Sequence, residues 1–240
     1  MVIVECQRPL VGLLAGCPGV DQWVARGDSL PTFDLHAPLL SVPGILKTSS
    51  ETIPAAIPYV FPKPALLEPW RKRLIALGGF KIGVVWQGSL TFRGDRFRSI
   101  PLRRFAPLAE VPGVRLSSLQ KGYGAEQLAE VRELFPVTDL AAELDTQSGP
   151  FLDTAAVMRS LDLVVTSDTV SAHLAGALGV PVWVALPLDP DWRWLLNRRD
   201  SPWYPTMRLF RQRELGNWRN VFEEIGQALR ERISLGAAEE

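Results

Sequence analysis

The residues best suited to chemistry lie around position 170. Ser167, Asp168 and Thr169 follow an apolar run at 161–166 and precede a segment with helical spacing that ends at Gly179. Their short side-chain oxygens can accept hydrogen bonds from the free N–H groups at the start of a helix. A helix that begins at the carboxyl end of a parallel strand presents those N–H groups and its positive dipole end to a ligand. The pattern therefore predicts an anion-binding site.

His173 falls in the first turns of the same predicted helix. The positive end of the helix dipole disfavours an imidazolium ion there, so we expect a neutral imidazole that can donate a hydrogen bond. A structural interpretation stays open, in which Asp168 only caps the helix and His173 is a half-buried histidine with satisfied hydrogen bonds.

One face of this helix is almost bare of side chains. Ala172, Ala175, Gly176 and Gly179 recur at positions i, i+3, i+4 and i+7. Such a face lets a helix lie close against a sheet, and close packing determines where the helix points. We therefore expect the helix start to be held firmly in the crevice at the sheet edge.

Two basic loops are expected at the same edge. The loop 87–98 is longer than the usual connection of about two to six residues, and it contains Arg93, Arg96 and Arg98. A guanidinium group matches phosphate oxygens in pairs and keeps its charge at any working pH. Lys121, in the loop after the next strand, would face the same crevice. The alternative is a solvated loop whose arginines pair with surface carboxylates, and it has more weight for Arg93 and Arg96 than for Arg98.

Composition excludes several classes of function. Of the 240 residues, 47% are apolar and 22% are charged, which is ordinary for a globular protein. Lys plus Arg and Asp plus Glu both number 26, so no overall charge would attract nucleic acid. The two cysteines and two histidines lack the spacing of metal ligands, so we expect no metal site. No run of about 18 apolar residues and no signal-peptide pattern occurs, so we expect a cytoplasmic protein without a transmembrane segment.

Strands and helices alternate from residue 80 onward. The predicted strands span 81–86, 114–119, 137–140, 161–166, 182–186 and 207–211, and the predicted helices span 102–109, 125–134, 151–161, about 169–178, and 218–233. Strands separated by helices of about ten residues favour an α/β fold with a doubly wound parallel sheet. The sequence lacks the G-x-G-x-x-G dinucleotide motif, the P-loop motif and the G-x-S-x-G motif.

The chain divides into three predicted parts. Residues 1–63 contain strands at 2–6 and 22–24, which are too few to stand alone, so we interpret them as a partial N-terminal α/β lobe. Residues 64–79 form a linker helix, and residues 80–240 form a complete Rossmann-like lobe.

Five sequence runs carry a family resemblance. They are DTVSAHLAGALGVP at 168–181, RSIPL at 98–102, SLQKG at 118–122, DWRWL at 191–195 and DSPWYP at 200–205. The first run resembles the donor-binding signature of GT-B glycosyltransferases related to heptosyltransferases, glycosyltransferase family 9. The other four are similar to transferase-like regions that follow tetratricopeptide repeats in bacterial proteins. The resemblance covers nearly the whole chain.

This resemblance implies a GT-B-like fold and the transfer of a sugar from a nucleotide-diphosphate sugar to an unknown acceptor. The reaction would need no metal or cofactor and would invert the sugar configuration. The lobe at 80–240 would bind the donor, and residues 1–63 would lie on the acceptor side. The expected diphosphate-binding residues are Arg98, Lys121, Asp168, Thr169, Val170, Ser171 and His173. The expected nucleoside or sugar pocket comprises Gln87, Gln120 and Trp192, although Trp192 could instead belong to an aromatic packing cluster.

The chain departs from the family pattern in two ways. Heptosyltransferases usually carry glycine where this chain has Val170, and a side chain there changes how closely a diphosphate can approach the backbone. The N-terminal elements that carry the family's general base precede the start of this chain, so we expect a fragment or a truncated product and assign no catalytic residue. The alternative function is a catalytically silent nucleotide-binding or scaffolding module associated with tetratricopeptide repeats.

Overall fold

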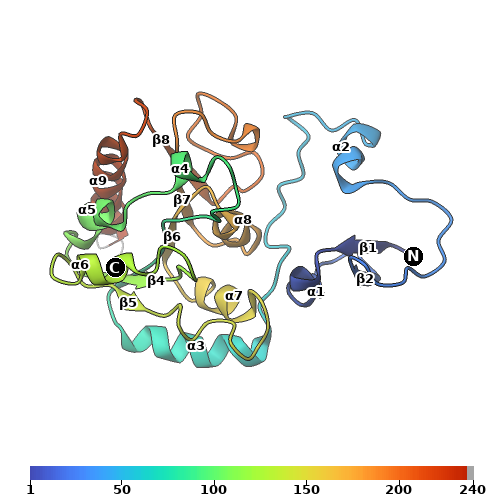
Figure 1. The fold of residues 1–240 in the computed structure, drawn as a ribbon, viewed down its shortest axis with the longest axis horizontal. Coiled ribbons are helices and arrows are strands. Elements are labelled where there is room, and N and C mark those ends of the chain that lie inside the picture. The colour runs from blue at the N-terminus through green and yellow to red at the C-terminus, as the bar shows by residue number, and fades with distance from the viewer. Residues whose placement is uncertain (237–240) are drawn as a thin grey trace.

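A six-stranded parallel sheet forms the centre of the computed structural model, which describes residues 1–236 (Figure 1). Its strands are β3 (Phe80–Val85), β4 (Val114–Ser118), β5 (Thr138–Asp139), β6 (Leu163–Ser167), β7 (Val182–Leu186) and β8 (Met207–Arg211). They lie in the order β5-β4-β3-β6-β7-β8, and all neighbours are parallel. The doubly wound sheet predicted from the sequence is confirmed. The strand order reverses between β3 and β6, which is where sheets of this kind bind ligands.

Two apolar cores lie on opposite faces of the sheet, because neighbouring residues of a strand point to opposite sides. In β7, Val182 and Val184 join the first core, whereas Trp183 and Ala185 join the second. The first core is covered by α3 (Pro64–Ala76), α7 (Leu152–Met158) and α8 (Val170–Ala177). The second is covered by η2 (Leu102–Phe105), α5 (Ala106–Ala109), α6 (Gln127–Val131) and α9 (Trp218–Gly236). None of the helices described in residues 1–236 has the length and apolar character needed to cross a membrane.

Several predicted elements are shorter or more irregular than expected. The predicted helix at 102–109 is a 3-10 turn followed by α5, because Pro107 has no N–H to continue the helical hydrogen bonds. The predicted helix at 125–134 is shortened to α6, and the residues before α6 form turns instead. In one of these turns the N–H of Ala125 donates to the carbonyl oxygen of Gly122 at 3.2 Å. The predicted loop 87–98 ends in the short helix α4 (Asp95–Arg98).

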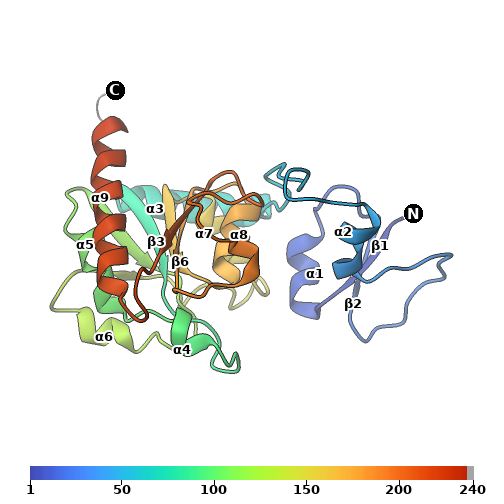
Figure 2. The same cartoon turned by 90° about the horizontal axis from the view of Figure 1, so that it is seen from above.

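The N-terminal residues form a small unit beside the main sheet (Figure 2). Its elements are the parallel pair β1 (Ile3–Cys6) and β2 (Gln22–Ala25), joined by α1 (Arg8–Leu14), and then η1 (Leu39–Ser41) and α2 (Val42–Ile45). Leu13 of α1 packs into the first core. In the extended connection to α3, the N–H groups of Tyr59 and Val60 donate to the carbonyl oxygen of Ala177, at 3.0 and 3.2 Å. The connection is therefore attached to the last residue of α8.

The small face of α8 is only partly used as predicted. Ala172 and Ala175 are fully buried in the first core, as a face packed on the sheet requires. Gly176, however, faces the ring of Tyr204, and a Cβ at this position would overlap that ring. Gly179 ends the helix with a φ of +70°, a backbone conformation that residues with side chains rarely adopt. The position of α8 thus depends on an aromatic side chain as well as on the sheet.

A reciprocal cap holds the start of α7. The Asp145 carboxylate accepts hydrogen bonds from the N–H groups of Asp153 (2.8 Å) and Thr154 (3.1 Å) and from the Thr154 hydroxyl (2.6 Å). The Asp153 carboxylate accepts in return from the N–H of Asp145, at 3.0 Å. Trp70 of α3 donates its indole N–H to the same Asp153 carboxylate at 2.7 Å. This cap joins α3, α7 and the loop that precedes α7.

The substitution Gly176→Ala tests the contact with Tyr204. We expect it to lower the free energy of unfolding by about 1–3 kcal/mol, the usual cost of overpacking a core. Urea unfolding followed by circular dichroism measures the change. Gly44→Ala is the matched control, because no atom lies within 4 Å of a Cβ placed on Gly44 of α2. Equal stability of the two variants would contradict the packing described for α8.

The substitution Asp145→Ala tests the cap of α7. Because it removes the acceptor for two N–H groups, we expect the free energy of unfolding to fall by about 1–2 kcal/mol. Asp145→Asn keeps one side-chain oxygen as acceptor and should lose less. Both values come from denaturant titration. An Asp145→Ala variant as stable as the unsubstituted protein would show that the cap contributes nothing.

Candidate functional site

Two cavities meet at the start of α8, beside the reversal of strand order between β3 and β6. The first has a volume of about 560 Å³ and the second about 610 Å³. Arg98, Thr169 and Val170 line both of them. The first cavity extends over the loops that follow β3 and β4, and the second extends over the loop that follows β7. A ligand longer than either cavity would pass the helix start.

The first N–H groups of α8 lie free at this junction. Thr169 is the N-cap, but its side chain makes no capping hydrogen bond within residues 1–236. The predicted capping by Ser167, Asp168 or Thr169 is therefore wrong, because the Thr169 hydroxyl lies 3.2 Å from the Thr166 hydroxyl instead. In the same described residues the N–H groups of Val170 and Ser171 have no acceptor, as expected in the first turn of a helix. Uncapped N–H groups are available to a ligand.

Arg98 is held beside this helix start by three contacts. Its Nη1 donates to the carbonyl oxygen of Asp168 at 2.8 Å, and its Nε donates to the buried Asp95 carboxylate at 3.1 Å. Its guanidinium carbon lies 4.2 Å from the centre of the Phe92 ring. A Cβ on Gly88 would overlap Asp95 and press against Arg98, so this packing requires glycine at position 88. The guanidinium charge is therefore placed next to the start of α8 before any ligand arrives.

Lys121 lines the first cavity together with Ser171 and Arg98. Its ammonium group donates one hydrogen bond to the carbonyl oxygen of Leu144. An ammonium group has three donors, so this bond leaves others for a ligand. Lys121, Arg98 and the start of α8 thus border a single cavity, as expected from the sequence.

Gln120 lines the first cavity. It is buried, and its side-chain oxygen accepts from the N–H groups of Trp86 (3.1 Å) and Gln87 (3.0 Å). Its side-chain nitrogen donates to the carbonyl oxygens of Gln87 (3.1 Å) and Tyr123 (2.9 Å). Gln87 also lines the cavity, and its side-chain oxygen accepts from Gln127 at 3.1 Å. These glutamines join the loops after β3 and β4. Gln120 uses both its amide oxygen and its amide nitrogen on protein partners, and Gln87 uses its amide oxygen.

The second cavity is lined by a half-buried histidine. His173 Nδ1 lies 3.2 Å from the Tyr204 hydroxyl, and its ring stacks on Trp194 with centroids 5.1 Å apart. Burial lowers the pKa of His173, and the positive charge of Arg193 lowers it further. A neutral imidazole was expected here, but burial is the main cause of the low pKa.

Asp168 lines the same cavity beside Arg193. Burial raises the pKa of the Asp168 carboxyl, and the indole N–H of Trp194 and the charge of Arg98 oppose the rise. The indole N–H faces the carboxylate, but the geometry between them falls short of a hydrogen bond. Asp189, Asp191 and Arg193 complete a polar wall on the loop after β7.

Trp192 lies outside both cavities as far as the described residues define them, which corrects its predicted place in the pocket. Its side chain is exposed, and its ring contacts Trp203 edge to face at 6.2 Å, with the Arg193 guanidinium above it at 4.9 Å. It belongs to an aromatic packing cluster. Arg93 and Arg96 likewise line neither cavity within residues 1–236.

Several lining residues were not predicted. Tyr123, Asp145, Phe151 and Thr154 line the first cavity. Asp145 and Phe151 have φ values of 55° and 65°, and no motif in the sequence signals such turns. The polar residues after β7 were detectable, because they follow a predicted strand and so must lie at the same sheet edge. Among residues 1–236, no three His, Cys, Asp or Glu side chains are grouped so as to hold a metal ion.

The low pKa of His173 can be measured directly, since the chain contains only two histidines. In a proton NMR titration we expect one imidazole to titrate below the usual value of about 6.5, and His173→Gln should remove that resonance. The unfolded chain then takes up a proton in a pH range where the folded chain does not, so stability falls as the pH drops through that range. His173→Gln should flatten this loss. A His173 resonance that titrates at or above the usual value would contradict the burial described.

The comparisons with known proteins agree with this architecture. No protein-family model matches the sequence. Protein FlbA of Caulobacter vibrioides is 30% identical over an alignment of 220 positions that covers 88% of this chain and 33% of FlbA. The chain thus spans about a third of the length of that curated relative.

Two solved structures resemble nearly the whole chain. One is the ADP-heptose LPS heptosyltransferase II of E. coli, with a TM-score of 0.60, 14% identity, and coverage of 98% of this chain and 90% of that chain. The other is the glycosyl transferase family 9 structure from Veillonella parvula, with a TM-score of 0.57, 14% identity, and coverage of 98% and 67%. At this identity the likeness concerns the fold, and the chain has the GT-B-like α/β fold of these proteins.

Proposed function

We propose that this chain binds a nucleotide-diphosphate sugar and is the donor-binding part of a glycosyltransferase. The observation that carries the proposal is the meeting of two cavities at the uncapped start of α8, beside Arg98. A nucleotide sugar has a diphosphate between two uncharged ends. Its shape therefore matches two pockets joined by an anion site.

The nucleoside would occupy the first cavity. Tyr123 and Phe151 offer aromatic rings against which a base can stack, and Leu119 adds apolar surface. Asp145 and Thr154, which belong to the cap of α7, add polar atoms to the lining. The cavity volume of about 560 Å³ lies in the range of small-molecule sites.

The diphosphate would lie at the junction of the cavities. The N–H groups of Val170 and Ser171, the guanidinium of Arg98 and the ammonium of Lys121 would share its oxygens. As the bond between sugar and diphosphate breaks, negative charge grows on the departing diphosphate. Groups held in place before the reaction stabilise that charge most effectively. Because two cationic side chains and a helix start supply this stabilisation, we propose a reaction that needs no metal ion.

The sugar would occupy the second cavity. Asp189, Asp191 and Arg193 could bind hydroxyl groups, and His173 borders the same space. An acceptor hydroxyl that attacks from the side opposite the diphosphate inverts the anomeric carbon in one displacement. We assign no general base within this chain, and the acceptor is unknown.

In this proposal each of the three predicted parts of the chain has its own role. Residues 1–63 would belong to the acceptor-side lobe, 64–79 to the linker and 80–240 to the donor lobe, of which 237–240 lie outside the described residues. Tetratricopeptide repeats upstream in a longer protein and a cytoplasmic reaction remain parts of the proposal. The repeats rest on the sequence resemblance alone, and the cytoplasmic reaction rests on the sequence patterns described above.

Val170 favours a second candidate, a module that binds a nucleotide without catalysis. Its side chain is 52% exposed and lines both cavities, so it stands where the diphosphate would pass. A β-branched side chain at this point keeps a ligand farther from the N–H groups than glycine would. The two candidates differ in turnover and agree on binding.

Thermal unfolding with UDP-, ADP- and GDP-sugars tests the shared binding claim. A true donor at about 100 times its Kd should stabilise the protein by about 2.7 kcal/mol. Arg98→Gln should weaken binding by about tenfold to a hundredfold, because one charged hydrogen bond to phosphate is lost. Arg96→Gln is the matched control: it removes the same charge from the same helix α4, at a residue that lines neither cavity.

The outcomes separate the two candidates. Stabilisation by a nucleotide sugar, lost in Arg98→Gln and kept in Arg96→Gln, supports donor binding at α8. Turnover in a longer protein that includes upstream sequence then supports the transferase, whereas binding without turnover supports the silent module. No stabilisation by any of these donors, in this chain or the longer protein, would rule out both.

A further inference from the structure

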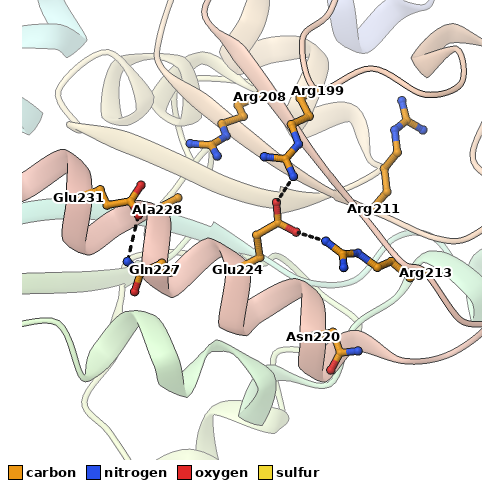
Figure 3. A pocket seen from close by; sticks show the side chains of 9 residues that line it. All are labelled: Arg199, Arg208, Arg211, Arg213, Asn220, Glu224, Gln227, Ala228 and Glu231. Atoms are coloured by element: carbon orange, nitrogen blue, oxygen red, sulfur yellow. Dashed lines mark hydrogen bonds and ion pairs between the residues drawn. The ribbon is translucent and has the colours of Figure 1, made fainter.

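A third cavity, of about 400 Å³, lies between β8 and α9 and shares no lining residue with the candidate site within the described residues (Figure 3). Four arginines line it, and we call it the arginine pocket: Arg199, Arg208, Arg211 and Arg213. Its other wall is one stripe of α9 with Asn220, Glu224, Gln227, Ala228 and Glu231. Spacings of three and four residues place this stripe on a single helix face. The arginine pocket is therefore formed by the edge strand β8, its flanking residues and one face of α9.

Glu224 is the centre of the arginine pocket. One carboxylate oxygen lies 3.2 Å from Arg199 and the other lies 3.8 Å from Arg213, and both arginines point toward it in Figure 3. The arginine side chains are 67% and 75% exposed. Ion pairs between such exposed groups are weak. An incoming anion could therefore take over these two guanidinium groups without breaking a strong interaction.

The other two arginines are also held in place. Arg208 makes no ion pair within residues 1–236, and its guanidinium lies over the rings of Phe210 (4.7 Å) and Trp183 (5.7 Å). Arg211 points away from Glu224, toward the carbonyl oxygens of Arg198 (3.1 Å) and Trp194 (2.6 Å). Among residues 1–236, Arg208 is thus a cation without an acidic partner in the lining of the pocket, and Arg211 adds a second positive charge to the same lining.

The local charge is unbalanced. The described lining residues include four arginines and two glutamates, Glu224 and Glu231, which leaves a local excess of two positive charges. The chain as a whole has a formal net charge of zero. A concentrated positive charge in a hollow attracts compact anions.

We propose that the arginine pocket binds a phosphate-bearing small molecule, with Glu224 holding the arginines in the ligand-free protein. Arg199 precedes β8, Arg208 lies within it and Arg213 follows it, and all three line one space, which suits the several oxygens of one phosphate group. Asn220, near the start of α9, provides a further amide donor. The phosphate replaces Glu224 as the partner of Arg199 and Arg213.

Calorimetric titration of the whole chain with inorganic pyrophosphate at low salt tests the proposal. Arg199→Gln and Arg208→Gln should each weaken binding about tenfold, because each removes a charged contact. Glu224→Gln should tighten binding several-fold, because it removes the competing carboxylate. Arg230→Gln is the matched control on α9, since it removes the same charge from an exposed residue that does not line the pocket within residues 1–236.

Arg98→Gln distinguishes this pocket from the candidate donor site. Binding that survives Arg98→Gln and falls in Arg199→Gln and Arg208→Gln supports the arginine pocket, whatever the outcome with nucleotide sugars. Absence of binding at millimolar pyrophosphate, or binding lost only in Arg98→Gln, overturns it. Polyglutamate that binds this pocket while pyrophosphate does not would also overturn it, in favour of an acidic protein segment. Circular dichroism checks that each variant is folded. Arg199→Lys provides a second variant, which keeps the positive charge but loses the paired N–H donors of the guanidinium group.

Discussion

The candidate site depends on the close contact between Gly176 and the ring of Tyr204. This contact positions α8, and the Tyr204 hydroxyl lies 3.2 Å from His173 on the same helix. At the other end of α8, Arg98 donates to the carbonyl oxygen of Asp168, immediately before the helix start. The free N–H groups are thus held from both sides. An anion site made of backbone N–H groups needs a fixed helix start, because these groups move only together with the helix and cannot reorient individually toward a ligand.

The order of strands and helices in the main lobe follows from apolar runs and helical spacing in the sequence. The irregularities of these elements do not follow from such patterns. The runs that became β6 and β7 are fully buried on both sides, so their apolar character marks them as central strands. The helix at 102–109 was overestimated, because apolar spacing does not register the hydrogen bond that Pro107 cannot make. The small face of α8 showed that the helix packs closely, but not that the ring of Tyr204, from a later loop, would fill the place of a side chain at Gly176.

The candidate site was predictable where a charged side chain follows the carboxyl end of a predicted strand. Arg98 and Lys121 were expected at one edge because each follows a predicted parallel strand, and both line the first cavity. Trp192 also follows a strand, but its exposed ring contacts Trp203 edge to face and lines neither cavity among the described residues. Gln120 shows the converse: a residue at the expected edge has all its amide groups committed to backbone partners. Sequence position gives the edge of the sheet, and tertiary contacts decide which side chains remain available.

The bond from Trp70 to Asp153 has a consequence beyond stability. Trp70 lies on α3, which follows the connection from the N-terminal unit, and Asp153 is bonded in turn to Asp145 at the wall of the first cavity. A rotation of α3 therefore strains the same carboxylate that orders this wall. Through these two hydrogen bonds, Trp70 couples the orientation of α3 to the position of Asp145 in the cavity lining.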